Sequence, residues 1–468
     1  MSKKILYAVI IIQALFLISA VMIGHAIGKA QAWSNNTKTF DFSLITDAMQ
    51  CISINYRDKE SIDQEKMMYG AVKGMAESLG DSYSQFLSPD MYRETLDDTT
   101  GKFGGLGIEI GMTTVDKQDQ LTVISVFEDN PAQKAGVLAG DYIVEIDGKP
   151  IAGINLFEAK RRLRGDPQTK VEIAIEREHE SELIKFNIIR DIIKVNTVKR
   201  RILNDIGYIR LTQFSDTTPK DFDKAIKYIE SAKVKGIILD LRSNPGGTLT
   251  AAVGVASVFL NSGQVVVSTK GRIQEDNKEF HVQKDVKHTN LPLTVLIDRW
   301  SASGSEIVVG AIKDYKRGII IGTDNSTYGK GSVQTIFPMI DNKSGLKLTV
   351  AYYYTPSGAN INKVGIKPDV KRPGFTTEEI KIYQDLISNK DIAKFAEGSG
   401  DNFLKQLDKS KGADKTKFDE LIKKLSSENI KINESLVKLA IAQKTKNEND
   451  EYEYDPLIKF AMDRLKNQ

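Results

Sequence analysis

Three serines stand close together after an apolar run, in the stretch DRWSASGSEIVVGAI of residues 298–312: Ser301, Ser303 and Ser305. A serine hydroxyl is a poor nucleophile until a neighbouring base removes its proton. No G-x-S-x-G turn, the usual setting of a histidine-activated serine in an α/β hydrolase, is present. The four histidines lie outside this stretch and have the pattern of ordinary surface residues: His25, His179, His281 and His288. The sequence therefore argues against a Ser-His-Asp enzyme.

A lysine can supply the missing base, because burial disfavours its charged form and lowers its pKa. The stretch STYGKGSVQT, residues 326–335, holds Lys330 between two glycines, just after the strand that follows the serine segment. It can therefore fold back toward the serines. Gln334 stands four residues further on, a spacing that shares one face in a helix and in a strand alike. We expect the Gln334 side chain to orient the lysine amine by a hydrogen bond.

The lysine segment has two competing interpretations. A phosphate-binding P-loop needs G-x4-G-K-[ST] between a strand and a helix. Here the spacing from Gly322 to Gly329 is two residues too long, and Gly331 stands where Ser or Thr must bind magnesium, so this function is excluded. A surface lysine in an ordinary turn stays open from this segment alone.

An acyl-transfer enzyme also needs hydrogen-bond donors for the negative oxygen that develops during the reaction. The stretch DLRSNPGGTLTAA, residues 240–252, has the pattern of a strand, a Pro-Gly-Gly turn and a helix. The backbone N–H of Gly246 or Gly247 can point at such an oxygen. A plain strand-to-helix turn is the alternative for this segment taken alone.

These segments need a rigid frame, and residues 195–373 have the pattern of one. The apolar runs GIILDL, LTVLID and RGIIIGT begin at positions 236, 293 and 317. Continuous apolar runs of this length predict strands that are covered on both faces. The first two are each followed by a turn and an apolar helix, and this alternation indicates an α/β core.

A different pattern fills residues 103–191, where short β runs alternate with turns around one helix expected at residues 156–164. The turn FGGLGIEI, the segment NPAQKAG and the strand-turn GDYIVEIDG follow one another in an order that resembles a PDZ domain. Such a domain binds an extended chain terminus as an added strand. By this resemblance, a terminal carboxylate is received by the backbone N–H groups of Leu106, Gly107 and Ile108. A scaffold module with a tight turn is the alternative.

Taken together, the motifs resemble the C-terminal processing peptidases, also called tail-specific proteases. DLRSNPGG, SASGSE and YGKGSVQ are similar to the family's three characteristic stretches, and the likeness spans residues 47–372. It implies a serine-lysine endopeptidase with a crotonase-like α/β core that cleaves proteins near their C-termini. It also implies that the PDZ domain recognises the substrate tail. Arg164, in the segment LRG, would contact the catalytic region when the PDZ domain gates the active site.

The resemblance also selects a nucleophile, because the middle serine of the family motif corresponds to Ser303. The family's usual spacing, counted back from Lys330, would instead reach Ser305. The loop of residues 322–329 is two residues longer than its common form, and removing two residues restores the match to Ser303.

Local chemistry favours the same serine, since Ser303 is expected to begin a helix, where backbone N–H groups are free. The N–H of Gly304 can then join that of Gly246 or Gly247 in an oxyanion hole. Ser301 becomes a turn residue, and Ser305 is expected to have a capping or packing role.

The N-terminus predicts where the protein works. Residues 5–24 form an apolar stretch preceded by Lys3 and Lys4. A helix of this length just spans a membrane, at about 30 Å of hydrocarbon, and the lysines place its start in the cytoplasm. The small-x-small sequence at residues 30–32 makes a cleaved signal peptide the alternative. In either case we expect the remaining chain outside the cytoplasm.

Composition narrows the partners. The 468 residues have a net charge of +3 and are 41% hydrophobic, which argues against a disordered chain and against nucleic acid as a partner. The single cysteine, Cys51, cannot form a disulfide within the chain or a cysteine-based zinc cluster. We expect it to be a small buried hydrophobe. No metal or other cofactor is expected.

The sequence thus predicts an α/β protein in which a PDZ domain is inserted before a crotonase-like peptidase core. The expected parts are an anchor or signal peptide (1–32), a helical region (40–100), the PDZ domain (101–191), the core (192–373) and a second helical region (374–468). The expected partners are protein C-termini, the membrane and, through the helical regions, a second copy of the chain. Two other functions stay open: a non-catalytic PDZ scaffold that binds C-termini, and crotonase-type chemistry on a thioester, against which the location argues.

Overall fold

The computed structural model describes residues 41–115, 118–127, 129–177, 180, 182–282, 289–372, 377–397, 413–427, 434–444 and 455–466. The expected membrane segment and the cleavage-like site at residues 30–32 lie outside this part of the chain, as do His25, His179 and His288. Within the described residues, no helix combines the length and the apolarity needed to cross a membrane.

The chain divides into two compact units, residues 1–72 and residues 73–468. The first unit contains α2 (Ser43–Asn55), the short helix η1 (Lys59–Ser61) and most of α3 (Gln64–Glu77). The expectation that Cys51 is buried is wrong, because its side chain is exposed on α2. No residue of α2 is buried, so no described element covers the face that carries the thiol.

A six-stranded sheet forms the centre of the second unit, in the order β10-β11-β12-β15-β16-β19. β10 and β11 are antiparallel, and the other neighbours are parallel. Every residue of β12 and β15 is buried, which confirms the two apolar runs as strands covered on both faces. The strands are β10 (Val198–Leu203), β11 (Ile206–Leu211), β12 (Gly236–Asp240), β15 (Leu293–Ile297), β16 (Ile319–Gly322) and β19 (Val370–Lys371).

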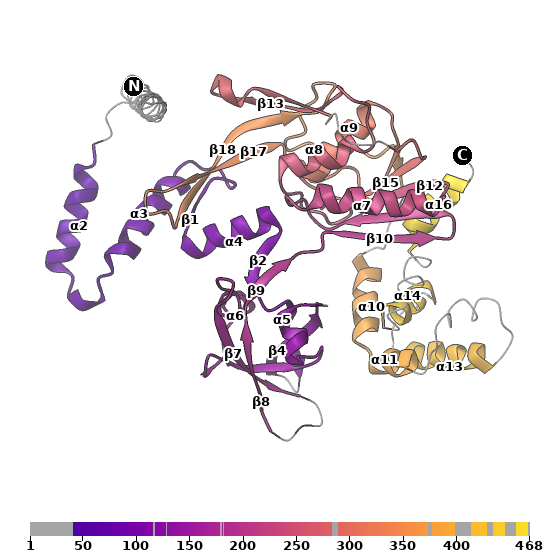
Figure 1. Cartoon of the computed structure of the whole chain (residues 1–468), viewed down its shortest axis with the longest axis horizontal. Coiled ribbons are helices and arrows are strands. Elements are labelled where there is room, and N and C mark those ends of the chain that lie inside the picture. The colour runs from indigo at the N-terminus through magenta and orange to yellow at the C-terminus, as the bar shows by residue number, and fades with distance from the viewer. Residues whose placement is uncertain are drawn as a thin grey trace, which may run out of the picture. The chain divides into compact units, whose positions relative to one another are not determined.

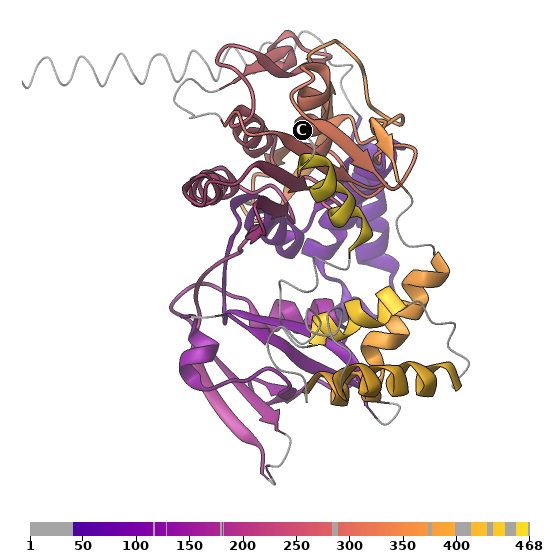
Figure 2. The same ribbon diagram turned by 90° about the vertical axis from the view of Figure 1, so that its right-hand side faces the viewer.

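The two faces of this sheet are covered by helices from different parts of the sequence. α7 (Thr218–Ser231), α8 (Leu249–Ser257) and α9 (Gly304–Asp314) pack with alternate strand residues in one large core. The intervening strand residues form a second core with α16 (Pro456–Lys466). Figures 1 and 2 show α16, in yellow, against the strands of this sheet. The sheet is therefore completed by the last helix that the structure describes.

A buried ionic network joins α16 to the strand end that leads into the Pro-Gly-Gly turn. Arg242 forms ion pairs with Asp240, with 2.6 Å between Nη2 and Oδ2, and with Asp455, with 2.8 Å between Nη1 and Oδ2. Tyr208 donates a hydrogen bond to the fully buried carboxylate of Asp240 over 2.7 Å. Buried charges need such partners, so the network fixes where β12 ends and where the turn begins.

A second sheet carries the lysine loop. Its path is β1-β18-β13-β14, and β17 also pairs with β18. Its strands are β1 (Gln85–Leu87), β13 (Val265–Gly271), β14 (Lys278–His281), β17 (Ser332–Pro338) and β18 (Gly345–Tyr354). The short helix η2 (Gln274–Asp276) joins β13 to β14. β1 lies far back in the sequence, so this sheet brings residues near position 85 beside the loop that contains Lys330.

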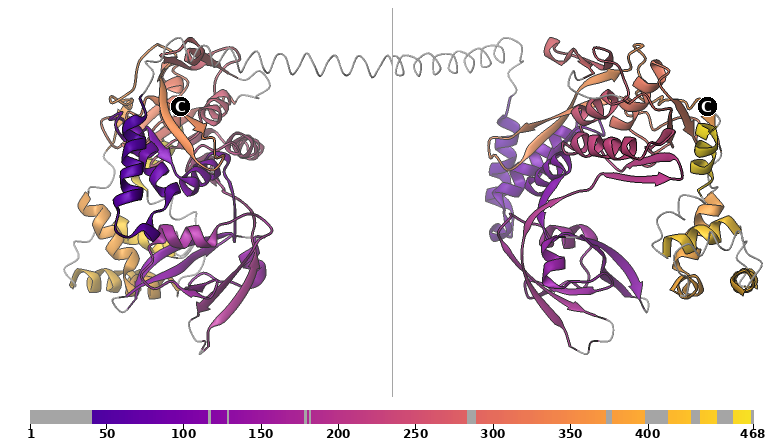
Figure 3. Two further views of the ribbon diagram at one scale, coloured as in Figure 1. Left: turned by 90° about the vertical axis from the view of Figure 1, so that its left-hand side faces the viewer. Right: turned by 45° about the vertical axis from the view of Figure 1, so that its right-hand side comes forward.

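The β module forms a sheet of its own in the order β3-β4-β5-β7-β8, with β6 paired to β5. Figure 3 shows its strands as one curved sheet, and the module has a separate apolar core. The chain enters after α4 (Pro89–Thr100) through β2 (Lys102–Gly105) and leaves through β9 (Asp191–Lys194), and these two strands pair with each other. The other elements are β3 (Ile108–Val115), β4 (Gln118–Val126), α5 (Pro131–Ala135), β5 (Tyr142–Ile146), β6 (Lys149–Pro150), α6 (Leu156–Leu163), β7 (Lys170–Glu176) and β8 (Ile184–Ile189).

The charged C-terminal region forms helices with a core of their own. They are α10 (Thr377–Ser388), α11 (Lys390–Glu397), α13 (Ala413–Ser427) and α14 (Glu434–Lys444). The lysine-rich helix α13 buries Phe418, Leu421 and Leu425 in that core. The interpretation of this segment as a solvated helix therefore holds for only one of its faces.

Candidate active site

Ser303 lies at a sharp turn between a strand and a helix. β15 ends at Ile297 and α9 begins at Gly304, so Ser303 is the residue immediately before the helix. Its backbone has φ 54° and ψ −113°, a conformation that non-glycine residues rarely adopt and that is found mainly at functional sites. The turn presents Ser303 to a cavity of about 620 Å³.

The two neighbouring serines are engaged by backbone carbonyls. Ser301 Oγ donates to Leu241 O over 2.8 Å, and Ser305 Oγ donates to Asn244 O over 3.0 Å. Both serines are fully buried, and neither lines the cavity. These contacts assign both residues to the structure of the turn and leave Ser303 as the one that faces the cavity.

Lys330 reaches the same cavity from the loop before β17. Its backbone N–H donates to Glu306 Oε2 over 2.9 Å, and its carbonyl accepts a hydrogen bond from Tyr353. Its ammonium nitrogen lies 5.1 Å from the centre of the Tyr83 ring. The backbone of the lysine is therefore held on both sides, and the residue lines the cavity that Ser303 also lines.

The two extra residues of the loop before Lys330 leave its end well anchored. Thr327 Oγ1 donates to Glu306 Oε1 over 2.5 Å, and Gly329 N donates to the same oxygen over 2.7 Å. Gly329 has φ +87°, and a Cβ there would lie 2.9 Å from Val364 N, so glycine is required. The loop therefore ends at a fixed point on α9.

The surroundings of Lys330 lower the pKa of its amine. Burial has the largest effect, the nearby cation of Lys347 lowers the pKa further, and the carboxylate of Glu306 raises it. Lys347 lines the same cavity from β18. Because only a neutral amine can accept a proton, these surroundings suit Lys330 to act as a general base.

The expected hydrogen bond from Gln334 to Lys330 is not formed among the described residues. Gln334 Nε2 instead donates to Ser332 Oγ over 2.8 Å and to Thr349 Oγ1 over 3.2 Å. The pairing of β17 with β18 shifts between Val333 and Gln334, and such a bulge breaks the alternation of side chains along a strand. Gln334 still lines the Ser303 cavity, so it lies in the site without contacting the lysine.

The Pro-Gly-Gly turn packs directly against Ser303. A Cβ at Gly246 would lie 2.7 Å from both Gly304 N and Ser303 Cβ, so only glycine permits this approach. The N–H of Gly246 already donates to Asn244 Oδ1 over 2.9 Å, which makes Gly247 the better donor candidate. Gly304 begins α9, where the first N–H groups lack partners within the helix. Gly247 and Gly304 are therefore the residues whose N–H groups are best placed to donate to an oxygen at Ser303.

We expect Gly247→Ala to lower kcat/KM by about 10²-fold or more, as the loss of one oxyanion donor does. Gly247 has φ +146°, and a Cβ there would lie only 1.8 Å from Phe214 O. The turn must therefore move, and its N–H must point elsewhere. Steady-state cleavage of an unstructured peptide measures the effect, with thermal unfolding recorded beside it.

The matched control for this prediction is Gly263→Ala. Gly263 also has a positive φ, +83°, but nothing lies within 4 Å of its added Cβ. This variant also places alanine at a positive φ, but it should keep the wild-type kcat/KM. Wild-type activity in the Gly247→Ala enzyme would show that Gly247 does not donate a hydrogen bond to the developing oxyanion.

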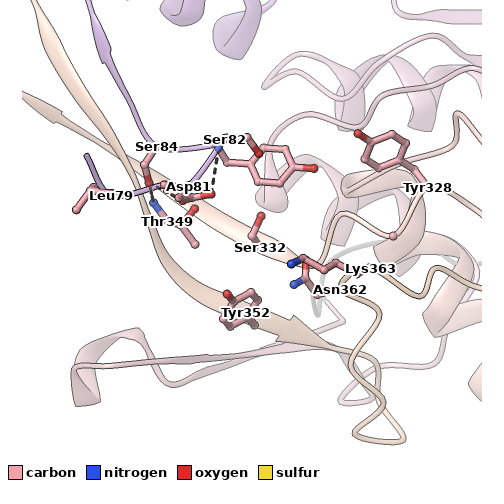
Figure 4. A pocket seen from close by; sticks show the side chains of 13 residues that line it. Leu79, Asp81, Ser82, Ser84, Tyr328, Ser332, Thr349, Tyr352, Asn362 and Lys363 are labelled. Carbon is pink, nitrogen blue, oxygen red and sulfur yellow. Dashed lines mark hydrogen bonds between the residues drawn. The ribbon is translucent and has the colours of Figure 1, made fainter. Parts of the chain in front are cut away.

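A second cavity, of about 700 Å³, adjoins the first at Ser332, which lines both. Figure 4 shows Ser332 between Ser82 on one side and Tyr328 on the other. The segment that contains Ser82 is fixed to β18, because Thr349 N donates to Ser84 Oγ over 3.0 Å. The two cavities therefore share Ser332, and the second one is lined mostly by polar residues.

The glycine-rich turn of the β module lines a cavity of about 790 Å³, with Leu106, Gly107 and Ile108 on its wall. Gly107 has φ +77°, and a Cβ there would lie 2.2 Å from Asn130 Cβ. β3 starts at Ile108 and lies at the edge of its sheet, so one side of this strand can pair with an added peptide.

Arg164 contacts the helix that precedes the β module. Its Nη1 lies 3.6 Å from Asp97 Oδ2 on α4, and its guanidinium lies 4.3 Å from the centre of the Phe103 ring. No described contact joins it to Ser303, so the expected contact with the catalytic region is indirect. The residue after Asp97 on α4, Asp98, lines the Ser303 cavity. α4 therefore connects Arg164 to the wall of that cavity.

Three further residues of this site were not predicted from the sequence: Glu306, Tyr83 and Tyr353. Glu306 stands three residues after Ser303, and the spacing S-x-x-E is typical of a helix capping box. That spacing is the signal that could have identified it. Tyr83 and Tyr353 come from distant segments, and no local pattern marks either of them.

Most of the chain matches models of known protein families. The descriptions "Peptidase family S41", "PDZ domain" and "Activating protease CtpB N-terminal domain" match residues 205–372, 108–188 and 18–91. The β module is therefore a PDZ domain, as its three motifs predict.

Curated relatives extend the likeness across most of the sequence. The chain is 43% identical to a carboxy-terminal-processing protease of Bartonella bacilliformis, over 72% of this chain and 76% of the relative. It is 32% identical to the carboxy-terminal processing protease CtpB of Bacillus subtilis, over 78% of this chain and 75% of the relative. With CtpA of the same organism the identity is 33%, over 74% and 71% of the two chains.

Proposed function

Because the chain belongs to peptidase family S41, a family of serine peptidases, we propose that Ser303 and Lys330 form the catalytic dyad of a C-terminal processing protease. One observation carries this proposal: both residues line one cavity, and the backbone N–H groups of both donate to the same carboxylate, that of Glu306. Gln334 shares the cavity and supports its wall through Ser332.

The proposed reaction follows the usual order of nucleophilic catalysis. The neutral amine of Lys330 accepts the Ser303 proton while Oγ attacks the peptide carbonyl carbon. The carbonyl oxygen becomes negative and accepts hydrogen bonds from Gly247 and Gly304. The C–N bond then breaks as the lysine ammonium returns a proton to the leaving amine, which gives an acyl-enzyme. Water attacks this ester with Lys330 again as base and releases Ser303.

We also propose that the PDZ domain selects substrates by their free C-terminus. The turn at Leu106, Gly107 and Ile108 lines a cavity at an open strand edge, which suits a terminal carboxylate followed by an extended chain. Binding of a peptide in this groove would affect the Ser303 cavity through Arg164 and α4, since Arg164 forms an ion pair with Asp97 on that helix.

The apolar residues 5–24 support a membrane-anchored enzyme whose substrates are extracytoplasmic proteins. The exposed apolar side chains of Leu44, Ile54 and Met68 support association of two copies through the N-terminal helices. Protease treatment of cells whose outer layers have been removed, with the cytoplasmic membrane intact, followed by detection of the chain, checks the first proposal: a fully protected chain contradicts it. A monomeric mass in solution contradicts the second.

Tail recognition is tested with two substrates that differ only at their end, one with a free carboxylate and one with a C-terminal amide. We expect the free carboxylate to be cleaved about tenfold better or more, because hydrogen bonds to a charged group contribute about 1.5–3 kcal/mol. Gly107→Ala should narrow this ratio, since a Cβ there collides with Asn130.

Gly140→Ala is the matched control within the same domain. Gly140 has φ +95°, and its added Cβ has nothing within 4 Å, so the ratio of the two rates should stay at the wild-type value. Equal cleavage of the two substrates by the wild-type enzyme would show that the free C-terminus is not recognised.

A further inference from the structure

Glu306 links the two proposed catalytic residues through their backbones. It is the third residue of α9 and is fully buried. Its Oε2 accepts hydrogen bonds from Ser303 N over 2.8 Å and from Lys330 N over 2.9 Å. Its Oε1 accepts from Gly329 N and Thr327 Oγ1, over 2.7 and 2.5 Å. One carboxylate thus holds both the serine turn and the end of the lysine loop.

The chemistry of these contacts selects the ionised form of Glu306. All four partners are donors, and an ionised carboxylate is purely an acceptor. Burial raises the pKa of Glu306, and the hydrogen bonds from Thr327, Gly329, Ser303 and Lys330 oppose that rise. Among the described residues, no Lys or Arg forms an ion pair with it. The site therefore keeps a buried negative charge that is stabilised mainly by hydrogen bonds from neutral donors.

We propose that Glu306 is a positioning residue of the peptidase, whose carboxylate fixes the distance and orientation between the Ser303 turn and the Lys330 loop. This inference depends on the proposed roles of Ser303 and Lys330. A network of charge-assisted hydrogen bonds holds its members more tightly than neutral bonds do. Displacing reacting groups by about 1 Å can cost about 10²-fold in rate, so the carboxylate affects catalysis without touching the substrate.

The charge of Glu306 has a second effect that opposes the first. Its carboxylate raises the pKa of Lys330, whereas burial and Lys347 lower that pKa. The Glu306 carboxylate therefore makes the Lys330 ammonium harder to deprotonate. Its positioning role explains why the fold keeps a charge with this unfavourable effect. The ionisable groups that surround the amine or line its cavity are Lys347 and Tyr353 of β18, Glu306 of α9, Tyr83 before β1 and Asp98 of α4.

Glu306→Gln separates the two effects, because it keeps the length of the side chain and removes the charge. One Gln oxygen can accept from two of the donors, and the amide nitrogen then faces the other two. We expect kcat to fall by about 10- to 10²-fold with KM within about twofold of wild type. At the same time, the acidic limb of kcat/KM should move to lower pH, since the Lys330 pKa falls.

Two companion variants make this result specific. Glu306→Asp keeps the charge but shortens the reach, so kcat should fall while the acidic limb stays in place. Lys347→Met removes a cation, so the limb should move to higher pH, opposite to Glu306→Gln. A side chain that merely stabilised the fold would leave kcat of the folded Glu306→Asp enzyme at the wild-type value. Thermal unfolding and binding of a tail peptide to the PDZ domain report whether each variant is folded.

Wild-type kcat in either Glu306 variant would overturn the inference, and so would an acidic limb that does not move in Glu306→Gln. If Glu306→Gln does not fold, Glu306→Asp tests the inference alone. A lowered kcat in that variant supports the positioning role, and a wild-type kcat contradicts it. The proposed dyad fails in a different way, by cleavage that survives Ser303→Ala. The two failures are therefore distinguished by separate variants.

Discussion

Ser303→Ala is expected to lower peptide cleavage by about 10⁴-fold or more, the usual effect of removing a nucleophile that acts as a unit with its base. The substrate cavity keeps its shape, because the Ser303 hydroxyl lies on its wall and the turn is held by the backbone bond to Glu306. Cleavage of an unstructured substrate with a free C-terminus measures the loss. Mass spectrometry of the enzyme with a serine-directed covalent inhibitor should place the adduct on Ser303.

Ser305→Ala is the control for this result. Its hydroxyl donates to Asn244 O within the described part of the chain, so its loss costs about 1 kcal/mol of stability and leaves the reaction in place. The variant should cleave at a rate within about tenfold of wild type. Full activity in Ser303→Ala, or an adduct on Ser305, would transfer the role of nucleophile and overturn the proposed dyad.

Lys330→Ala and Lys330→Arg are both expected to be inactive at every pH at which the enzyme stays folded. Alanine removes the base, and the arginine guanidinium stays protonated and cannot accept the serine proton. In the wild type, activity should rise with pH as the ammonium loses its proton. Because burial lowers the pKa of Lys330, this rise should occur below the pH at which a free lysine titrates. Measurement of kcat/KM against pH gives the limb directly.

Lys343→Ala provides the comparison, because Lys343 is exposed in the turn between β17 and β18. It should leave the whole pH profile unchanged. Activity in Lys330→Arg that still rises with pH would show that another group is the base.

Much of the frame could be predicted from the sequence, because its signals are local. The continuous apolar runs at β12 and β15 predicted strands that are covered on both faces, and both strands are fully buried. Ser303 could be placed at the start of a helix from the small residues around it and the apolar segment that follows. The PDZ domain could be recognised because three of its motifs follow one another in order, and at the first of them Gly107 has a positive φ and lies close to Asn130.

The parts that could not be predicted depend on tertiary contacts. The contact expected between Gln334 and Lys330 fails because a bulge at Val333 re-aims the side chain. The N–H of Gly246 is engaged by Asn244, which no spacing reveals. Tyr83 meets the lysine only because β1 pairs with β18, about 260 positions further along the chain.

The position of α16 late in the sequence determines when, during synthesis, the central sheet can be covered on both faces. A nascent chain that has reached residue 372 already contains every proposed catalytic group, but one face of its sheet, with Ile238 and Leu296, still lacks the cover of α16. Arg242, which leads into the glycine turn, also lacks Asp455. The cover of that face and the ionic network that fixes the glycine turn are therefore completed only after α16 has been synthesised.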